Sequence, residues 1–496
     1  MSKGAGGALL DMLAVRRTPG RPIYRQIFAG IRERILRGEL AVGTRLPSTR
    51  TLARELSVSR HTVMQAFEQL QAEGLISSQV GDGAYVLDGG AGHGFAAAPD
   101  KPSEAGPDIA PRQVALSSRG ARLAGSGLAR RPELAQRAFY PGLPALDLFP
   151  RAVWRRLSNR HLAASGTGLY GYGDVAGLPA LRAALADYLQ VARGMTVAAD
   201  DVVVLSSTWQ ALDIALRLAG DTGDRAWLEN PGPEQVHAVV RAAGMSPVSV
   251  PTDADGLVVA EGEKRAADAR LAIVNPSHQF STGGVMSLAR REALLAWARR
   301  SQALVVENDY ECEFRYDDRP LTPLHALDGG QGVLYLGTFS NILGPGLRLA
   351  YAVVPPGLRT AFLAAKQVVS GHTALFNQAV LADFIGEGYL VSHIRRLRDA
   401  YGERRRALMQ ALTAQLGSRA TLHATGRGTS LILELYDGQA AAISRAAAAQ
   451  GVAVKPLDAY YQAGADLNAL VLGYAAVTEA EVPRAVARLK AAFERS

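Results

Sequence analysis

Short, wholly apolar runs separated by amphipathic stretches recur through most of this 496-residue chain, and they constrain its fold more than any other feature. Four of these runs are Val202–Leu205, Leu271–Val274, Leu304–Val306 and Val333–Leu336. Such runs are typical of strands buried on both faces, and helical segments between strands favour parallel pairing. The pattern therefore predicts an α/β body built around a mostly parallel sheet.

The chain after this sheet also follows an α/β pattern. We expect a long, arginine-rich helix near 376–415. Strand-like runs at 430–435 and 470–474 then alternate with helical stretches. The C-terminal part is therefore predicted to form a smaller α/β subdomain.

Composition excludes several classes of protein. Apolar residues make up 48% of the chain and charged residues 20%, which is ordinary for a globular protein. There is no apolar run of about 18 residues and no secretory signal pattern, so we expect neither a membrane span nor export. The single cysteine, Cys312, rules out an internal disulfide and fits a cytoplasmic protein. The net charge of +8 suits an anionic partner.

Residues 20–88 are predicted to form a small domain of three helices and a β-hairpin. The first helix has an apolar stripe made of Ile23, Ile27, Ile31 and Ile35. Ser48 and Ser59 are placed to cap two further helices. The turn Gly81-Asp82-Gly83 between two strand-like runs predicts a hairpin. Together these elements make a winged helix-turn-helix.

A winged helix-turn-helix can place a helix in the major groove of double-stranded DNA, which we expect as the partner. Arg and Gln can pair with base edges, whereas hydroxyl groups and helix N-termini suit phosphates. The candidate DNA-binding residues at the two helix starts and in the wing are Arg45, Ser48, Thr49, Arg50, Ser59, Arg60, His61, Thr62, Gln65, Gly81 and Gly83. The alternative for any one of these arginines is a solvated surface charge.

The segment 89–133 differs from both of its neighbours. It is rich in Gly, Ala, Pro and Ser and has little periodicity, so we expect a flexible linker. The predicted body then occupies 134–496.

Several motifs carry a resemblance to a known family. The runs LPSTR at 46–50, VSR at 58–60 and GDGAYV at 81–86 closely resemble the GntR-type winged helix of bacterial regulators. FYPGLPALDLFP at 139–150 and NPSHQFSTG at 275–283 resemble the MocR subgroup of GntR regulators. The resemblance spans almost the whole chain. It implies a winged helix fused to a fold type I aminotransferase-like domain, the class of fold that uses pyridoxal phosphate.

The resemblance also implies which residues would hold pyridoxal phosphate. Its phosphate would be bound by hydroxyl groups, an arginine and backbone N–H groups at a helix N-terminus. The implied cofactor-binding residues are Ser207, Thr208, Asn275, Tyr310, Thr338, Ser340 and Arg348, with Tyr310 facing the phenolic oxygen of the cofactor. The alternative is that Thr338 and Ser340 merely satisfy backbone groups in a tight turn.

The catalytic residues that the family pattern requires are missing. In the segment GTFSNILGPGLRLAY, Asn341 occupies the position of the Schiff-base lysine, and an amide cannot form an imine. The family pattern Glu-Asp-Asp-Tyr reads Glu-Asn-Asp-Tyr at 307–310, so Asn308 stands where a carboxylate would face the pyridine nitrogen. Asp309 could replace it if the local register differs. Pro233 replaces a family tyrosine, and Val471 stands where an arginine often binds the substrate carboxylate.

We therefore expect no catalytic residues and no transaminase activity. Lys366 and Lys455 are candidate substitute amines, although nothing in the sequence places either at the ring. Covalent binding of pyridoxal phosphate is not expected, whereas noncovalent binding and absence of binding both stay open. We expect no metal site.

The leading hypothesis is a cytoplasmic, homodimeric, sequence-specific transcription regulator whose aminotransferase-like domain senses an unidentified small-molecule effector. The second hypothesis is an active pyridoxal phosphate-dependent aminotransferase that also binds DNA. The third is an architectural dimer whose large domain binds nothing.

Overall fold

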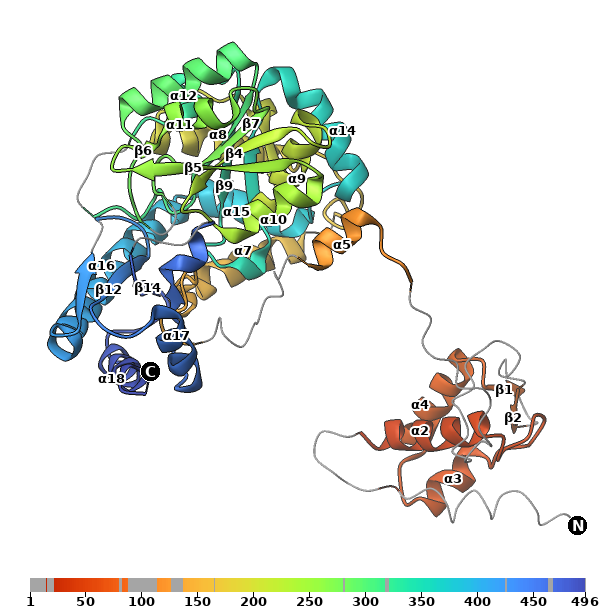
Figure 1. Cartoon of the computed structure of the whole chain (residues 1–496). Helices are drawn as coiled ribbons and strands as arrows, with labels where there is room; N and C mark the ends of the chain where they lie inside the picture. Colours follow the sequence, from red (N-terminus) through yellow and green to blue (C-terminus); the bar gives the residue numbers. More distant parts are fainter. Residues whose placement is uncertain are drawn as a thin grey trace, which may run out of the picture. The chain divides into compact units, whose positions relative to one another are not determined.

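Figure 1 shows the computed structural model of the chain, which divides into two compact units, Met1–Gln113 and Val114–Ser496. The structure describes residue 15 and residues 22–79, 83–87, 114–125, 137–164, 166–279, 282–316, 321–423, 426–462 and 467–495. No helix in these ranges is long and apolar enough to cross a membrane.

The N-terminal unit has the predicted three helices and hairpin. They are α2 (Ile23–Leu36), α3 (Thr49–Glu55), α4 (Arg60–Ala72), β1 (Ile76–Gln79) and β2 (Gly83–Val86). Ile27 and Ile31 are fully buried against α4, while Ile23 and Ile35 lie at the edge of the same core. The two strands pair antiparallel, with Ile76 opposite Val86. Gly81 and Asp82 of the predicted turn lie outside the described residues.

The second unit contains an eight-stranded sheet. Its spatial order is β3 (Val202–Leu205), β10 (Ala350–Val353), β9 (Val333–Thr338), β8 (Leu304–Asn308), β7 (Leu271–Val274), β4 (Arg225–Asn230), β5 (Ser246–Asp253) and β6 (Gly256–Leu257). β10 runs antiparallel to both of its neighbours and β6 runs antiparallel to β5, whereas the other neighbouring strands pair parallel. The predicted mostly parallel sheet is confirmed.

Helices cover both faces of this sheet (Figure 1). On one face, Leu271 and Ile273 of β7 pack with α9 (Thr208–Ala219), α10 (Glu234–Ala243) and α14 (Arg359–Ser370). On the other face, Ala272 and Val274 pack with α11 (Val259–Ala266) and α12 (Leu288–Ser301). Alternate residues of one strand thus enter two separate cores, which explains why the strand is apolar throughout. The same unit also contains the helices α7 (Arg151–Ala163), α8 (Pro179–Arg193), α13 (Leu324–Leu327) and α15 (Leu375–Gly386).

The C-terminal part forms the predicted smaller subdomain. Its four-stranded antiparallel sheet has the order β11 (Ala420–His423), β12 (Ser430–Leu435), β14 (Ala469–Gly473) and β13 (Lys455–Pro456). The helices α16 (Tyr389–Leu416), α17 (Ala440–Ala449) and α18 (Val482–Phe493) accompany it.

The single long helix predicted near 376–415 is wrong. Two helices, α15 and α16, occupy that region and are separated at Gly388. The φ angle of Gly388 is +78°, a backbone conformation that glycine adopts without steric cost and that an α-helix cannot contain.

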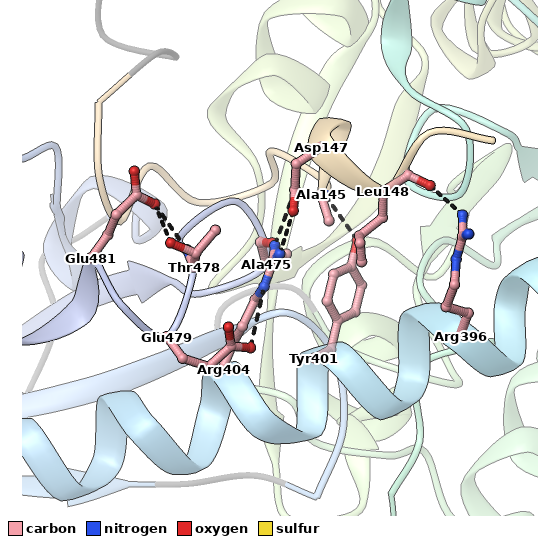
Figure 2. A network of polar contacts seen from close by, with 10 residues as sticks. All are labelled: Ala145, Asp147, Leu148, Arg396, Tyr401, Arg404, Ala475, Thr478, Glu479 and Glu481. Carbon is pink, nitrogen blue, oxygen red and sulfur yellow. Dashed lines mark hydrogen bonds and ion pairs between the residues drawn. The ribbon is translucent and has the colours of Figure 1, made fainter. Parts of the chain in front are cut away.

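A polar network attaches the segment 145–148 to α16, as Figure 2 shows. Arg404 donates two hydrogen bonds to the carboxylate of Asp147, and its guanidinium also reaches the backbone oxygen of Ala475. The hydroxyl of Tyr401 accepts a hydrogen bond of 3.0 Å from the backbone N–H of Ala145. Arg396 donates to the backbone oxygen of Leu148. Three turns of one helix therefore fix this segment.

The predicted linker 89–133 contains regular structure. Residues 118–124 form helix α5 (Ser118–Ala124), which packs against α10. The hydroxyl of Ser117 caps α5 by accepting a hydrogen bond of 3.0 Å from the N–H of Gly120. The expectation of an unstructured segment is therefore wrong at this helix, because a serine cap can start a helix that packing then stabilises. The boundaries 20–88, 89–133 and 134–496 themselves stay a prediction.

We expect Ile31→Ala to destabilise the N-terminal unit by about 2–5 kcal/mol, because it removes a fully buried side chain from α2. In calorimetry of the full chain, the melting temperature of this unit should fall, whereas that of the second unit, Val114–Ser496, should not change. Leu36→Ala is the matched control, because Leu36 lies on the same helix and is 52% exposed. Equal shifts of both transitions would contradict the division into two units.

Candidate functional site

The carboxyl edge of the large sheet gathers the residues predicted to hold a cofactor. Ala350 of β10 pairs with Leu205 of β3 on one side and with Thr338 of β9 on the other. The residues that precede Ala350 therefore lie between those that follow Leu205 and Thr338. In open α/β sheets, ligands bind at this carboxyl edge.

One end of the edge has the groups that a phosphate needs. Ser207 caps α9, its hydroxyl accepting a hydrogen bond of 3.3 Å from the N–H of Gln210, and Thr208 is the first residue of that helix. The first-turn N–H groups of a helix favour an anion. Ser340 and the exposed Arg348 lie on the connection between β9 and β10. Thr338 accepts a hydrogen bond of 3.1 Å from the N–H of Ser340, so its hydroxyl does serve the turn, as the alternative reading required.

A chain of amide hydrogen bonds occupies the centre of the edge. Asn275 donates from its side chain to Glu229 Oε2 (2.6 Å) and from its backbone to Glu229 Oε1 (3.2 Å). Its Oδ1 accepts a hydrogen bond of 2.8 Å from Asn308 Nδ2. Burial raises the pKa of the Glu229 carboxyl to about 7, against the lowering effect of the bonds from Asn275. Asn308 therefore lies on the same side of the edge as Asn275.

Asp309 points away from this chain. Its carboxylate is fully buried, forms an ion pair of 2.5 Å with Arg193 and accepts a hydrogen bond of 2.6 Å from the hydroxyl of Tyr335. The register that would bring Asp309 to a pyridine nitrogen is therefore not the one in this structure. The ring of Tyr310 packs edge-on against that of His278, with the ring centroids 5.7 Å apart.

The residue at the expected lysine position contacts a carboxyl group. Asn341 Nδ2 lies 3.4 Å from Glu311 Oε1, and Thr429 donates to Glu311 from its backbone (3.1 Å) and its hydroxyl (2.7 Å). His278 Nε2 lies 3.6 Å from Glu311 Oε2. We call these four residues the Glu311 cluster: Glu311, Asn341, Thr429 and His278.

Burial sets the protonation of the Glu311 cluster. It raises the pKa of Glu311 to about 7, although the hydrogen bonds from Thr429 act in the opposite direction. It lowers the pKa of His278 to about 4, and the nearby Arg427 adds to this lowering. Sequence reasoning missed Glu311 and Thr429 as site residues. The position of Glu311 directly after Tyr310 could have pointed to it, whereas Thr429 comes from a distant segment.

The two substitute lysines are engaged elsewhere. Lys366 is fully buried on α14, and its ammonium donates a hydrogen bond of 2.7 Å to the backbone oxygen of Gly371. Burial lowers the pKa of Lys366 to about 8. The ammonium of Lys455 lies over the rings of Tyr140 and Tyr460, at 5.5 and 5.8 Å.

A small pocket, partly open to solvent, lies beside Pro233, where the family resemblance places a tyrosine. Glu229, His237 and Asn275 line it together with apolar side chains. His237 is 1% exposed, and neither of its ring nitrogens has a hydrogen-bond partner among the described residues. Burial lowers the pKa of His237 to about 4, with Arg241 contributing. Val471 is buried within β14 and packs with Tyr460.

The candidate DNA-binding side chains cluster on the N-terminal unit. Ser48 and Ser59 cap α3 and α4 through hydrogen bonds of 3.1 Å from the N–H groups of Thr51 and Thr62. Their hydroxyls therefore stabilise the helix starts themselves. Arg60 Nε lies 3.4 Å from the hydroxyl of Thr49, which joins the two helix starts.

The remaining candidates are arranged around these starts. Arg45, Arg50 and His61 are exposed, and Gln65 is half-buried. Arg45 stands over the ring of Tyr85 in the hairpin and lies close to Gly83, where a side chain would crowd its guanidinium. The helix starts and the base of the wing thus present several cations together. Gly81 lies outside the described residues.

Comparison with known proteins identifies both units. Residues 23–86 match the model for bacterial regulatory proteins of the gntR family, and residues 140–489 match the model for aminotransferase class I and II. The chain is a gntR-family transcriptional regulator with an aminotransferase-like domain. The prediction of a DNA-binding regulator is thereby confirmed.

Individual relatives agree with this assignment. The regulator is 36% identical to a protein of Rhizobium meliloti named probable rhizopine catabolism regulatory protein MocR, over 97% of this chain and 96% of the relative. It is 30% identical to the pyridoxine biosynthesis regulator PdxR of Corynebacterium glutamicum, over 94% and 95% of the two chains. The α-aminoadipate aminotransferase LysN of Thermus thermophilus, solved with N-(5'-phosphopyridoxyl)-L-leucine, has a TM-score of 0.68 and 29% identity, covering 77% of this chain and 99% of LysN.

We expect His237→Leu to stabilise the regulator by about 1 kcal/mol at pH 7, because it removes buried ring nitrogens that lack partners. The gain should grow as the pH falls from about 6.5 towards 4. In that range the unfolded chain binds a proton on His237 that the folded protein excludes, so acid destabilises the natural protein more. Denaturant unfolding at several pH values tests this, with the exposed His423→Leu as control. A variant less stable than the natural chain would contradict the assignment of unpartnered nitrogens.

Proposed function

We propose that this regulator binds an operator through residues 22–87 and senses a small phosphorylated molecule at the carboxyl edge of its large sheet, without covalent chemistry. It would act in the cytoplasm as a homodimer, in which two DNA-binding units meet repeated half-sites. The observation that carries the proposal is the position of Asn341, whose amide lies against Glu311 beside the phosphate-binding end of the edge.

The side chains at the edge fit only part of pyridoxal phosphate. The start of α9, Ser340 and Arg348 suit its phosphate. Asn341 offers no amine for its aldehyde, and Asn308 offers no carboxylate for its ring nitrogen. When bound in an enzyme, the cofactor supplies an electron sink for reactions of amines. Here Asn308 donates to Asn275 and remains uncharged, so this chain's residues support binding and orientation and do not support turnover.

A ligand at this edge regulates DNA binding only if it binds one arrangement of the units more tightly than another. Three connections leading from the sheet meet there, those after β3, β8 and β9. A ligand that bridges them stabilises the folded body and biases its conformation. An architectural domain, by contrast, would show no change in melting temperature with any ligand.

We expect no covalent adduct when the natural protein is incubated with pyridoxal phosphate, reduced with borohydride and weighed intact, because Asn341 cannot form an imine. Asn341→Lys should give an adduct on a minority of molecules, because Asn308 and Pro233 remain in place. A full adduct on the natural chain would overturn the proposal and support an active aminotransferase. Lys366→Gln and Lys455→Gln would then locate the amine.

We expect Arg60→Ala to weaken operator binding by about 1–3 kcal/mol with little effect on unrelated DNA, as loss of a base contact does. Arg50→Ala should weaken binding to all sequences and lower the slope of log K against log salt by about one, as loss of a phosphate contact does. Footprinting and titration on the regulator's own upstream region measure both. Arg37→Ala, an exposed arginine paired with Glu33, is the control. Absence of any protected site at physiological salt would contradict the proposed operator binding.

A further inference from the structure

Glu311 is a buried carboxyl group whose recorded partners are neutral. Thr429 donates two hydrogen bonds to it, and Asn341 contributes an amide N–H. The one ion pair recorded for Glu311 in the described part of the chain is with His278. His278 is neutral at physiological pH, because burial lowers its pKa to about 4. Buried carboxylates are normally paired with a cation, and none is recorded for Glu311 within the part of the chain that the structure describes.

The backbone at Glu311 supports a functional role for this group. Its φ angle is +60°, a left-handed conformation that a residue with a long side chain adopts at an energetic cost. Residues held in such conformations concentrate at ligand sites and are kept there by their surroundings. The surroundings here are tight, because a side chain at Gly428 would overlap His278 and come within 3.1 Å of Glu311 Oε2. The fold thus holds Glu311 towards Asn341.

The amine that a lysine would have supplied at position 341 is missing, while a carboxyl group that would face such an amine remains. We propose that the ligand brings this amine itself: the edge binds a phosphorylated compound with a primary ammonium group, which pairs with Glu311 and Asn341. This inference rests on the proposed sensor function and names its ligand class. No covalent bond forms or breaks on binding.

The phosphate-binding groups and the pair of Glu311 and Asn341 are close enough for one small molecule to contact both. Ser340, at the phosphate end, is the chain neighbour of Asn341, at the ammonium end. Both follow β9, and the start of α9 lies on the same edge of the sheet, one strand beyond β10. A ring that bears a phosphate arm and an aminomethyl arm on neighbouring carbons presents the two charges at such a short separation. Pyridoxamine 5'-phosphate has this arrangement and is the probe of choice.

Three ligands that share one ring allow the contribution of the amine to the affinity to be measured separately from that of the rest of the molecule. Pyridoxamine, pyridoxine and pyridoxal 5'-phosphate carry an ammonium, a hydroxyl and an aldehyde at the same carbon. Titration calorimetry of the full-length regulator should give an affinity for pyridoxamine 5'-phosphate at least about tenfold higher than for pyridoxine 5'-phosphate, because a charge-assisted hydrogen bond forms in a buried site. Inorganic phosphate reports the contribution of the phosphate end alone.

Two variants test whether Glu311 is the partner of the amine. Glu311→Gln keeps the shape and removes the charge, so the preference for the amine ligand should fall to about twofold or less. Asn341→Lys places a protein ammonium beside Glu311 and should remove the same preference, which keeps the test usable if Glu311→Gln folds poorly. Glu434→Gln, which alters a half-exposed carboxyl group on β12 that pairs with His423, is the matched control and should keep the full preference.

The preference should also rise with pH. Burial raises the pKa of Glu311 to about 7, so its charge develops between about pH 6 and 8, while the ligand ammonium stays protonated. Of the groups facing Glu311, His278 and Tyr310 remain neutral in this range, because burial lowers the pKa of the first and raises that of the second. The ratio of the two affinities cancels the titration of the phosphate. The charges of Glu313 and Arg427 nearby are common to the natural chain and Glu311→Gln, so a loss of the pH dependence in that variant assigns it to Glu311.

Each outcome tests two proposals: that Glu311 pairs with an ammonium group of the ligand, and that the edge senses a phosphorylated molecule. A tenfold preference that Glu311→Gln removes supports the inference. Equal affinity for the amine and hydroxyl ligands, or tighter binding of the aldehyde, overturns it and leaves the sensor function standing. If none of the four ligands binds, both the inference and the proposed phosphate sensor are wrong.

Discussion

The buried ion pair between Arg193 and Asp309 is the interaction on which the candidate site depends. Arg193 ends α8, and Asp309 follows β8 directly. The same pair reaches the loop after β7 through a 3.1 Å hydrogen bond from Arg193 to Ser277, and reaches β9 through Tyr335. Removal of one partner of such a pair costs about 3–5 kcal/mol, because it leaves a buried charge alone. The backbone on either side of Asp309, which carries the site residues of β8, is fixed as a result.

The two ends of the sheet edge differ in how easily substitution can remove their function. The phosphate end depends largely on backbone N–H groups at the start of α9, which any sequence that keeps the helix also keeps. The other end depends on single side chains, so one substitution at each of positions 341 and 308 is enough to change its chemistry. A site of this fold can therefore lose covalent chemistry and keep its affinity for an anion.

Sequence reasoning succeeded where local pattern determines structure. The apolar runs specified the strands of the large sheet, since both faces of each strand are buried, and Ser48 and Ser59 marked helix starts because their hydroxyls cap them. It failed where tertiary contacts decide. Gly388 breaks a helix that composition alone would continue, and α5 is held by packing on α10. The role of Glu311 depends on Thr429, whose position beside it follows only from the folded subdomain.

The amide chain from Glu229 through Asn275 to Asn308 also limits how the site could change in future. An aspartate introduced at position 308 would put a second carboxyl group at the end of a chain that already contains the buried Glu229, and no ion pair with a cation is recorded for Glu229 among the described residues. A lysine introduced at position 341 would lie beside Glu311 and could form an ion pair with it. Of these two substitutions, the introduced lysine therefore costs less than the introduced aspartate.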